Sequence, residues 1–320
     1  THSLFERKDA MADWLIYGAY GYTGELCVAE ALRRGLRPVL AGRDEVRLRT
    51  LAERYALPWR AFSLDDRNAL EHGLAGMGGV LHCAGPFSRT AVPMAEACLR
   101  ARIHYADITG EIEVFEALAA KDAQAKAAGV MVLPGAGFDV VPSDCLARYL
   151  KELCPEADTL RLAFQGIGRP SHGTQVTILE HLASGGRIRA HGALKRVPAA
   201  WKCREVDFGE GPRTVVTIPW GDVSTAFRST GIPNIEVYMA ASESMRKTMR
   251  RSNVLWPLLG LPRVRKWMQR RVTPGGPDEQ RRNEGYGLLW GEAVAPDGKR
   301  AEAWLRTPEA YTFTAQTAVR

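Results

Sequence analysis

Short apolar runs alternate with stretches of helical periodicity through the first part of the chain. Runs of this kind are typical of buried strands, and apolar positions spaced three and four apart are typical of helices that cover a sheet. The pattern predicts strands at residues 14–17, 38–42, 59–64, 78–84, 104–108 and 130–133 and helices at residues 26–34, 45–55, 68–74, 93–102 and 112–128. Because strands that alternate with helices form a parallel sheet covered on both faces, this part is predicted to be an α/β domain with the doubly wound Rossmann fold.

The rhythm changes after Asp144, where strands outnumber helices. The pattern there predicts strands at residues 159–165, 214–219, 234–240, 287–295 and 301–306 and helices at residues 174–189 and 244–272. This arrangement favours a second, α+β domain with a mostly antiparallel sheet that carries the substrate and a dimer interface. We therefore divide the chain into residues 11–144 and residues 145–320, and a helix expected near Thr312 leaves open a return of the chain to the first domain.

Three glycines, Gly18, Gly21 and Gly24, follow the first predicted strand. A diphosphate can rest on a helix N-terminus only where the preceding turn is tight and no Cβ blocks the backbone N–H groups. Strand, glycine turn, helix and second strand come in the order that a dinucleotide site requires, although glycines that only form turns are the simpler alternative. The predicted coenzyme contacts in this turn are Gly18, Tyr20, Gly21, Tyr22, Thr23 and Gly24.

Arg43 follows Gly42 at the end of the second predicted strand. A site for NAD commonly has an acidic residue there, which accepts from the ribose 2′-hydroxyl, whereas an arginine can pair with the 2′-phosphate of NADP. The alternative is that Arg43 and Asp44 only open the next helix, with Asp44 as its N-cap. We interpret Gly42 and Arg43 as coenzyme contacts and predict that the coenzyme is NADP.

Composition and charge exclude several classes of protein. With 46% hydrophobic and 25% charged residues the chain is an ordinary globular sequence, and no apolar run is long enough to span a bilayer. We therefore expect a cytoplasmic protein. The six cysteines form no Cys-x-x-Cys pair, and His172, His181 and His191 lack the i, i+4 spacing of a helical metal site, so no metal is predicted.

Four motifs resemble those of the saccharopine dehydrogenase-like oxidoreductases, in particular the branch that includes trans-acting enoyl reductases. They are GAYGYTG at residues 18–24, CAGPFS at residues 83–88, YADITGE at residues 105–111 and PGAGFDVVPSD at residues 134–144. The resemblance extends over residues 13–190. It implies an NADP-binding Rossmann domain followed by an α+β domain, without a particular substrate.

Further coenzyme contacts are expected at the carboxyl ends of other strands, where open parallel sheets bind their ligands. Gly85 would allow close backbone approach and Pro86 would stiffen the turn, although a glycine-proline pair can also be only a turn. The residues expected to line the coenzyme in these loops are Leu64, Asp65, Cys83, Ala84, Gly85 and Pro86.

Asp107 and Asp139 are the candidate catalytic residues, on the loops after the fifth and sixth strands, with Thr109 and Ser143 nearby. Reduction of a double bond needs a proton source as well as a hydride, and a carboxylic acid can supply the proton if burial raises its pKa. The alternative is structural, with Asp107 closing its own turn and Ser143 and Asp144 starting the next helix.

Basic residues are concentrated between residues 244 and 271, which contain nine arginines and lysines and no carboxylate, although the whole chain carries a net charge of only +7. The segment also includes the apolar run 254–261. Cations beside apolar residues fit peripheral contact with an anionic membrane, or docking of an acidic acyl carrier or a CoA-linked substrate. A helical pair packed into the domain or a dimer interface is equally consistent, and no nucleic-acid motif accompanies the charge.

Three hypotheses for the function remain at this point. The first is an NADPH-dependent reductase of a lipid-like, acyl-carrier-linked or CoA-linked substrate, which would act as a homodimer. The second is a non-catalytic NADP(H)-binding sensor or interaction protein. The third is an amino-acid dehydrogenase that reduces an imine, for which Arg161, Arg169, Arg187 and Arg189 could bind substrate carboxylates.

Overall fold

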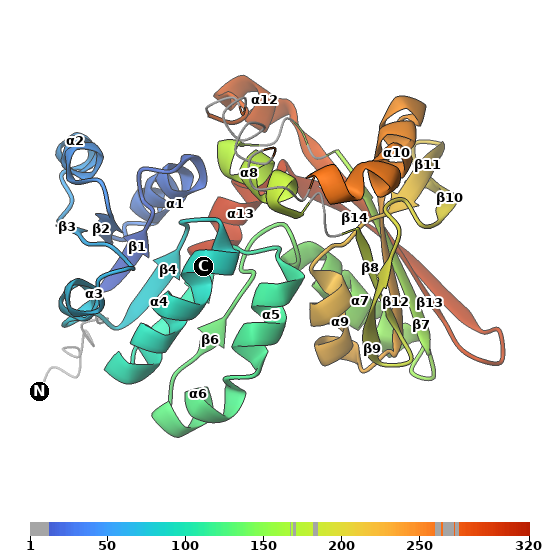
Figure 1. Cartoon of the computed structure of the whole chain (residues 1–320), viewed down its shortest axis with the longest axis horizontal. Coiled ribbons are helices and arrows are strands. Elements are labelled where there is room, and N and C mark those ends of the chain that lie inside the picture. Colours follow the sequence, from blue (N-terminus) through green and yellow to red (C-terminus); the bar gives the residue numbers. More distant parts are fainter. Residues whose placement is uncertain are drawn as a thin grey trace, which may run out of the picture.

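The computed structural model describes residues 13–166, 168, 171–181, 185–259, 264, 272 and 275–320. Two sheets, each with helices packed against it, lie side by side along the long axis of the molecule (Figure 1). The N-terminal part of the chain builds the first sheet, and the second sheet follows.

The first domain is a parallel sheet with the strand order β3-β2-β1-β4-β5-β6, which confirms the predicted Rossmann fold. Its strands are β1 (Trp14–Tyr17), β2 (Val39–Gly42), β3 (Trp59–Ala61), β4 (Gly79–His82), β5 (His104–Asp107) and β6 (Val132–Leu133). Its helices are α1 (Tyr22–Arg33), α2 (Glu45–Tyr55), α3 (Arg67–Leu74), α4 (Phe87–Ala101), α5 (Ile112–Ala119) and α6 (Asp122–Ala128). The strand order reverses between β1 and β4, which is where such sheets bind ligands.

Alternate residues of β1 enter two separate cores, one on each face of this sheet. Leu15 and Tyr17 pack with residues of α3 and α4, whereas Ile16 packs with residues of α1 and α2. Side chains of a strand point to opposite faces in turn, so a strand covered on both faces must be apolar at every position. This explains why β1 reads as a continuous apolar run.

The second domain contains an eight-stranded sheet with the main order β10-β11-β12-β7-β13-β14, and β8 pairs with both β12 and β9. Its strands are β7 (Thr159–Gln165), β8 (Gly186–Ala190), β9 (Ala193–Val197), β10 (Cys203–Asp207), β11 (Pro212–Thr217), β12 (Asn234–Ala240), β13 (Tyr286–Val294) and β14 (Arg300–Pro308). The helices of this part are α7 (Val141–Leu153), α8 (His172–His181), α9 (Asp222–Thr230), α10 (Glu243–Leu259), α12 (Glu279–Glu284) and α13 (Ala310–Ala318). Among the described strands of this sheet, only β7 and β12 pair in parallel, so the sheet is mostly antiparallel as predicted.

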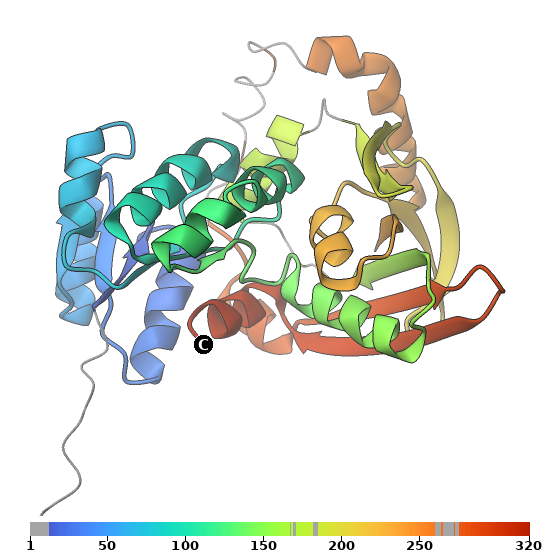
Figure 2. The same ribbon diagram turned by 90° about the horizontal axis from the view of Figure 1, so that it is seen from below.

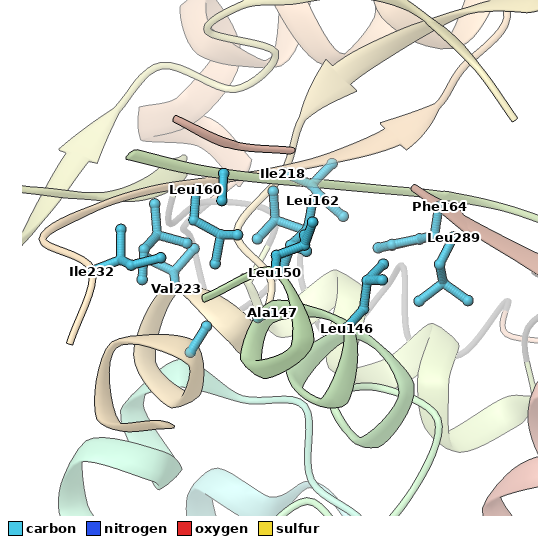
Figure 3. Close-up of a cluster of buried hydrophobic side chains, with 14 of the residues drawn as sticks. Leu146, Ala147, Leu150, Leu160, Leu162, Phe164, Ile218, Val223, Ile232 and Leu289 are labelled. Atoms are coloured by element: carbon cyan, nitrogen blue, oxygen red, sulfur yellow. The ribbon is translucent and has the colours of Figure 1, made fainter. Parts of the chain in front are cut away.

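Helices α7 and α9 cover one face of the second sheet. Leu146 and Leu150 of α7 meet Leu160 and Leu162 of β7 in a continuous buried cluster (Figure 3). Burial of a leucine side chain contributes roughly 1.5–3 kcal/mol, so these contacts anchor α7 firmly. The anchored helix in turn holds the loop before it, which contains Asp139.

Several contacts between described residues connect the domains, and two of them bear on the site. Helix α13 is last in the sequence but packs on α1 of the first domain, where Ala315 and Val319 enter the core (Figure 2). On α5, Glu116 Oε1 accepts hydrogen bonds from Arg189 at 3.1 Å and from the Ser224 hydroxyl at 2.6 Å. The loops at the carboxyl ends of β5 and β6 are therefore held against the second domain.

Helix α4 begins at Phe87, whereas the sequence pattern predicts a start at Pro93, and this prediction was wrong. The backbone N–H groups of Phe87 and Ser88 donate to the Glu111 carboxylate at 2.8 and 3.0 Å. This carboxylate satisfies free helix donors and balances the positive end of the helix dipole. Pro93 therefore lies inside the helix, where it removes one intrahelical hydrogen bond.

Glu111→Ala is expected to lower the free energy of unfolding by about 1–3 kcal/mol, because it leaves two helix N–H groups without their acceptor. Urea unfolding of the variant and the unchanged chain measures the difference. The matched control is Glu113→Ala, which removes a side chain that is 53% exposed and is expected to cost less than about 0.5 kcal/mol. Equal losses in the two variants would contradict the capping role of Glu111.

Other predicted boundaries were wrong where tertiary contacts override the local pattern. Helix α1 begins at Tyr22 rather than at residue 26, β3 ends at Ala61, and the helix predicted at residues 112–128 is two helices, α5 and α6. The helix predicted at residues 174–189 is described as α8 up to His181, and the last part of the predicted range lies in β8, which pairs with β9 and β12. Helix α7 begins before Ser143 and has no side-chain cap. The pattern also missed β8, β9, β10, α9 and α12.

Candidate coenzyme and active site

The three glycines form a tight turn between β1 and α1. Gly18 has a φ of 84°, and a Cβ at this residue would lie 2.9 Å from the backbone nitrogen of Ala84. Gly21 precedes α1 without a side-chain cap, so the first N–H groups of the helix have no acceptor among the described residues. Free donors at a positive helix end, reached without any Cβ in the way, fit the diphosphate of a dinucleotide.

Gly24→Ala is expected to weaken coenzyme binding by about tenfold or more, because the new Cβ would overlap the Gly18 carbonyl oxygen and push α1 away from the turn. Calorimetric titration with NADPH gives the dissociation constants. Gly79→Ala is the control, since a Cβ there would lie at an ordinary contact distance of 3.5 Å from His104. An unchanged affinity in the Gly24 variant would show that the turn does not hold the coenzyme.

Arg43 follows β2, and its exposed side chain has no partner among the described residues. Asp44 caps α2, as the alternative interpretation of this pair held, because it accepts from the Arg47 N–H at 3.1 Å. Tyr20 of the glycine turn accepts from the Asp44 N–H at 3.2 Å, and the Arg47 guanidinium stacks 4.6 Å from its ring centroid. A Cβ on Gly42 would collide with this ring. Arg47 is therefore engaged within the protein, whereas Arg43 is available to a phosphate.

Leu64 and Asp65 lie near the same edge of the sheet as Arg43. Leu64 is half-buried against the first-domain core, and Asp65 is exposed. Burial raises the pKa of the Tyr17 hydroxyl, the charge of Asp65 adds to this increase, and Arg43 opposes it. The charges of Arg43 and Asp65 therefore both act on the buried Tyr17 hydroxyl.

The loop after β4 borders the glycine turn. Ala84 contacts Gly18, Cys83 and Pro86 are half-buried, and Gly85 is exposed. The peptide bond between Gly85 and Pro86 is cis. This arrangement brings the loop and the glycine turn together at the reversal point of the sheet, between β1 and β4.

Asp107 ends β5 and is fully buried. Its Oδ1 accepts from the N–H groups of Thr109 and Gly135, each at 2.9 Å, and its Oδ2 accepts from the Tyr105 hydroxyl at 2.6 Å. Burial raises the pKa of Asp107 to about 6, and these donors oppose the increase. The Asp107 carboxyl thus joins the loops after β5 and β6. This is a structural role, the alternative to a catalytic role for Asp107.

Asp139 lies on the loop after β6 and is half-buried. A Cβ on Gly110 would lie 2.5 Å from its Oδ2, so the carboxyl rests on the backbone that follows β5. Burial raises the pKa of Asp139 to about 6, and the charge of Glu111 adds to this increase. No donor of the described residues bonds to its oxygens. A partly accessible carboxylic acid with such a pKa can donate a proton near neutral pH.

Asp222 is a buried carboxyl that the sequence pattern did not reveal. It starts α9 after Gly221, where a Cβ would lie 3.5 Å from the Gly110 carbonyl oxygen. Its oxygens make no hydrogen bond of good geometry within the described residues. Burial and the charge of Asp144 raise its pKa well above the usual value, although the Ser143 hydroxyl favours the charged form. A Gly-Asp pair after a strand is a helix-start signal that could have found it.

The arginines considered for a substrate carboxylate are mostly engaged elsewhere. Arg161 forms an ion pair across the second sheet at 2.8 Å. Arg189 is only 6% exposed and bonds to two backbone carbonyls and to Glu116. Arg187 lies 3.6 Å from a glutamate of α5, and Arg169 lies outside the described residues.

The basic segment 244–271 is described only in part. On α10, Lys247, Arg250 and Arg251 are exposed, and Lys247 pairs with Glu243 at 2.7 Å. The apolar side chains at 254–261 and the five cations from residue 263 onward lie outside the described residues. Among the residues that the structure does describe, no helix is both long and apolar enough to cross a bilayer.

The turn, the sheet order and the loops after β4, β5 and β6 together define a two-domain protein with a dinucleotide-binding Rossmann domain. Residues 14–133 match the protein family described as "Saccharopine dehydrogenase NADP binding domain". The first domain belongs to this family, so the resemblance seen in the motifs is confirmed. The family indicates an NAD(P) coenzyme.

Two relatives are similar to part of the chain in sequence, and one solved structure is similar to it in fold. The chain is 28% identical over 194 residues to a "Trans-acting enoyl reductase" of Mycobacterium ulcerans, with 58% of this chain and 45% of that protein covered. It is 36% identical over 141 residues to the protein of that name from Mycobacterium leprae, with 41% and 34% covered. The match thus spans less than half of each relative. Saccharopine dehydrogenase (L-Glu forming) from Saccharomyces cerevisiae has the same fold, with a TM-score of 0.62, 11% identity and coverage of 96% and 89%.

Proposed function

We propose that the chain is an NADPH-dependent reductase of a lipid-like substrate linked to an acyl carrier or to CoA. The observation that carries the proposal is the half-buried Asp139, whose carboxyl lies against Gly110 at the carboxyl ends of the strands. The similarity to proteins named trans-acting enoyl reductase supports an activated double bond as the group that is reduced.

The residues of the first domain fit the coenzyme that the family implies. The glycine turn and the free N–H groups of α1 would hold the diphosphate, and Arg43 would pair with the 2′-phosphate. The loop that contains Cys83, Ala84, Gly85 and Pro86 would form a wall of the site. When bound, NADPH supplies a hydride to the substrate.

The chain itself would supply the proton and position the substrate. In its protonated form Asp139 donates this proton from its carboxyl group to the carbon next to the thioester carbonyl, while the neighbouring carbon takes the hydride. Trp220, just before Gly221 in the same group of loops, packs against Phe164 with the rings tilted and 4.6 Å between their centroids. Phe164 is buried in the core, so the half-buried Trp220 is the side chain that would offer an apolar wall to the substrate.

Two other functions are compatible with the sequence. A non-catalytic NADP(H) binder is supported by Asp107, because its carboxylate oxygens accept three hydrogen bonds from within the protein. An imine dehydrogenase is disfavoured, since Arg161 and Arg189 are held in ion pairs and cannot easily bind a substrate carboxylate. The binder therefore remains the competing proposal.

Peripheral membrane contact through residues 244–271 and a homodimer built on the second domain belong to the same proposal. Light scattering after size exclusion measures the oligomeric state. Co-sedimentation with vesicles that contain anionic lipids, compared with neutral vesicles, tests membrane contact, and no binding to either kind would remove it from the proposal.

The reductase is tested by following NADPH oxidation with trans-2-enoyl thioesters of CoA that differ in chain length. The expected result is oxidation that depends on the acyl chain. If NADPH binds but no acyl or imine substrate is reduced, the non-catalytic binder is the better assignment. Mass spectrometry of molecules that copurify with the chain gives an independent identification of the ligand.

A further inference from the structure

Tyr22, the first residue of α1, connects the glycine turn to the second domain. Its hydroxyl donates to the Pro277 carbonyl at 2.5 Å and accepts from Arg282 Nη1 at 3.2 Å. A Cβ on Gly276 would lie 2.6 Å from the tyrosine ring, and the Tyr311 ring packs edge-on at 5.1 Å. These contacts hold residues 276–278 and the start of α12 at the N-terminal end of α1.

Arg282 brings a positive charge to the N-terminal end of α1. The side chain is half-buried, and no carboxylate of the described residues lies within ion-pair distance of it. Its Nη1 also donates to the Pro277 carbonyl at 2.9 Å, whereas Nε and Nη2 have no partner among the described atoms. The nearby Glu309 carboxylate caps α13 through its Oε2.

A cation beside the positive end of a helix is unfavourable unless an anion binds to both. The first N–H groups of α1 have no acceptor in the described part of the chain, and they begin at Tyr22, whose hydroxyl contacts Arg282. The guanidinium edge formed by Nε and Nη2 offers two parallel donors, the arrangement that pairs with phosphate oxygens. The structure therefore presents two sets of unused donors for one anion, from two domains.

We propose that Arg282 of the second domain binds the diphosphate of the coenzyme together with the N–H groups of α1. The inference rests on the coenzyme site proposed above and adds a residue that lies outside the glycine motif and outside the family match at residues 14–133. A coenzyme held in this way links the two domains and fastens residues 276–278 beside the turn.

The test compares Arg282→Gln with the unchanged chain by calorimetric titration with NADPH, NADH and adenosine 2′-monophosphate. NADPH and NADH share the diphosphate, so both are expected to bind about tenfold more weakly to the variant. Adenosine 2′-monophosphate has no diphosphate, so its affinity in competition with NADPH is expected to stay unchanged. Arg281→Gln is the matched control, because this exposed neighbour lies 3.6 Å from Asp278 and does not contact Tyr22.

Unchanged affinity for NADPH and NADH would overturn the proposal, as would an equal loss with adenosine 2′-monophosphate or an equal loss in the Arg281 variant. If Arg282→Gln does not fold, Tyr22→Phe takes its place, since it keeps the ring packing and removes only the hydroxyl that positions Arg282. That variant is expected to bind both dinucleotides about threefold more weakly, and no loss would overturn the proposal. Because binding is measured without turnover, the result is independent of whether the reductase activity is found.

Discussion

Replacing Asp139 by asparagine is expected to slow NADPH-dependent reduction by about 10²- to 10⁴-fold, the usual effect of removing a general acid. Asparagine has nearly the same shape, so the loop after β6 and the coenzyme site should be preserved. NADPH affinity is therefore expected to stay within about twofold. Stopped-flow measurement of NADPH oxidation and calorimetric titration separate the two quantities.

The pH dependence gives the same test a second readout. Asp139 has a pKa raised to about 6, so the carboxyl is mostly protonated below pH 6 and ionised above it. A proton donor is needed for reduction, so kcat should be highest below pH 6 and fall as the pH rises through this value. The Asn variant should lose this dependence, because it has no proton to release in this range.

Two further variants show whether Asp139 or Asp107 is the proton donor. Asp122→Asn changes an exposed carboxylate that pairs with Lys126 on α6, and it should leave the rate unchanged. If Asp139→Asn keeps the full rate and Asp107→Asn abolishes it with NADPH still bound, the proton donor is Asp107. A full rate in both variants would remove the proton-donor role from this group of loops.

Arg43→Ala is expected to weaken NADPH binding by about 30- to 100-fold and NADH binding by less than about twofold. The guanidinium would lose its charge-assisted hydrogen bonds to the 2′-phosphate, a group that NADH does not have. Titration of the variant with both coenzymes measures this difference. Arg43 is exposed and has no partner among the described residues, so the change should not disturb the fold.

The control for this experiment is Arg49→Ala on α2, an exposed arginine that pairs with Glu45 at 2.8 Å. It should leave both affinities unchanged. Equal weakening of NADPH and NADH by Arg43→Ala would remove the basis for preferring the phosphorylated coenzyme, and weakening of neither would place the 2′-phosphate elsewhere.

The parts of the site that could be predicted from the sequence are those built by neighbouring residues. Gly18, Gly21 and Gly24 are separated by only a few positions, and a tight turn before a helix demands glycine for reasons of local backbone space. Arg43 directly follows β2, so its place at the edge of the sheet depends only on where that strand ends. The side-chain alternation along β1 likewise follows from strand geometry alone.

The parts that could not be predicted depend on residues distant in sequence. Helix α4 starts at Phe87 because Glu111 caps it from another loop, and no local signal marks that start. The stretch that ends in β8 has helical periodicity, but pairing with β9 and β12 makes its last part a strand. Asp222 lies beside the loops around Asp139 because α9, which it starts, packs there.

The sequence by itself determined the Rossmann domain, because strands alternate with helices along it, and it determined the glycine turn and the place of Arg43, because each depends on a few adjacent residues. Only the tertiary structure decided that three donors bond to Asp107 while Asp139 stays partly accessible. Both residues are aspartates, so their difference comes from the residues that surround each of them. It also decided that Arg282 lies at the N-terminus of α1, because long-range packing alone brings these two parts of the chain together.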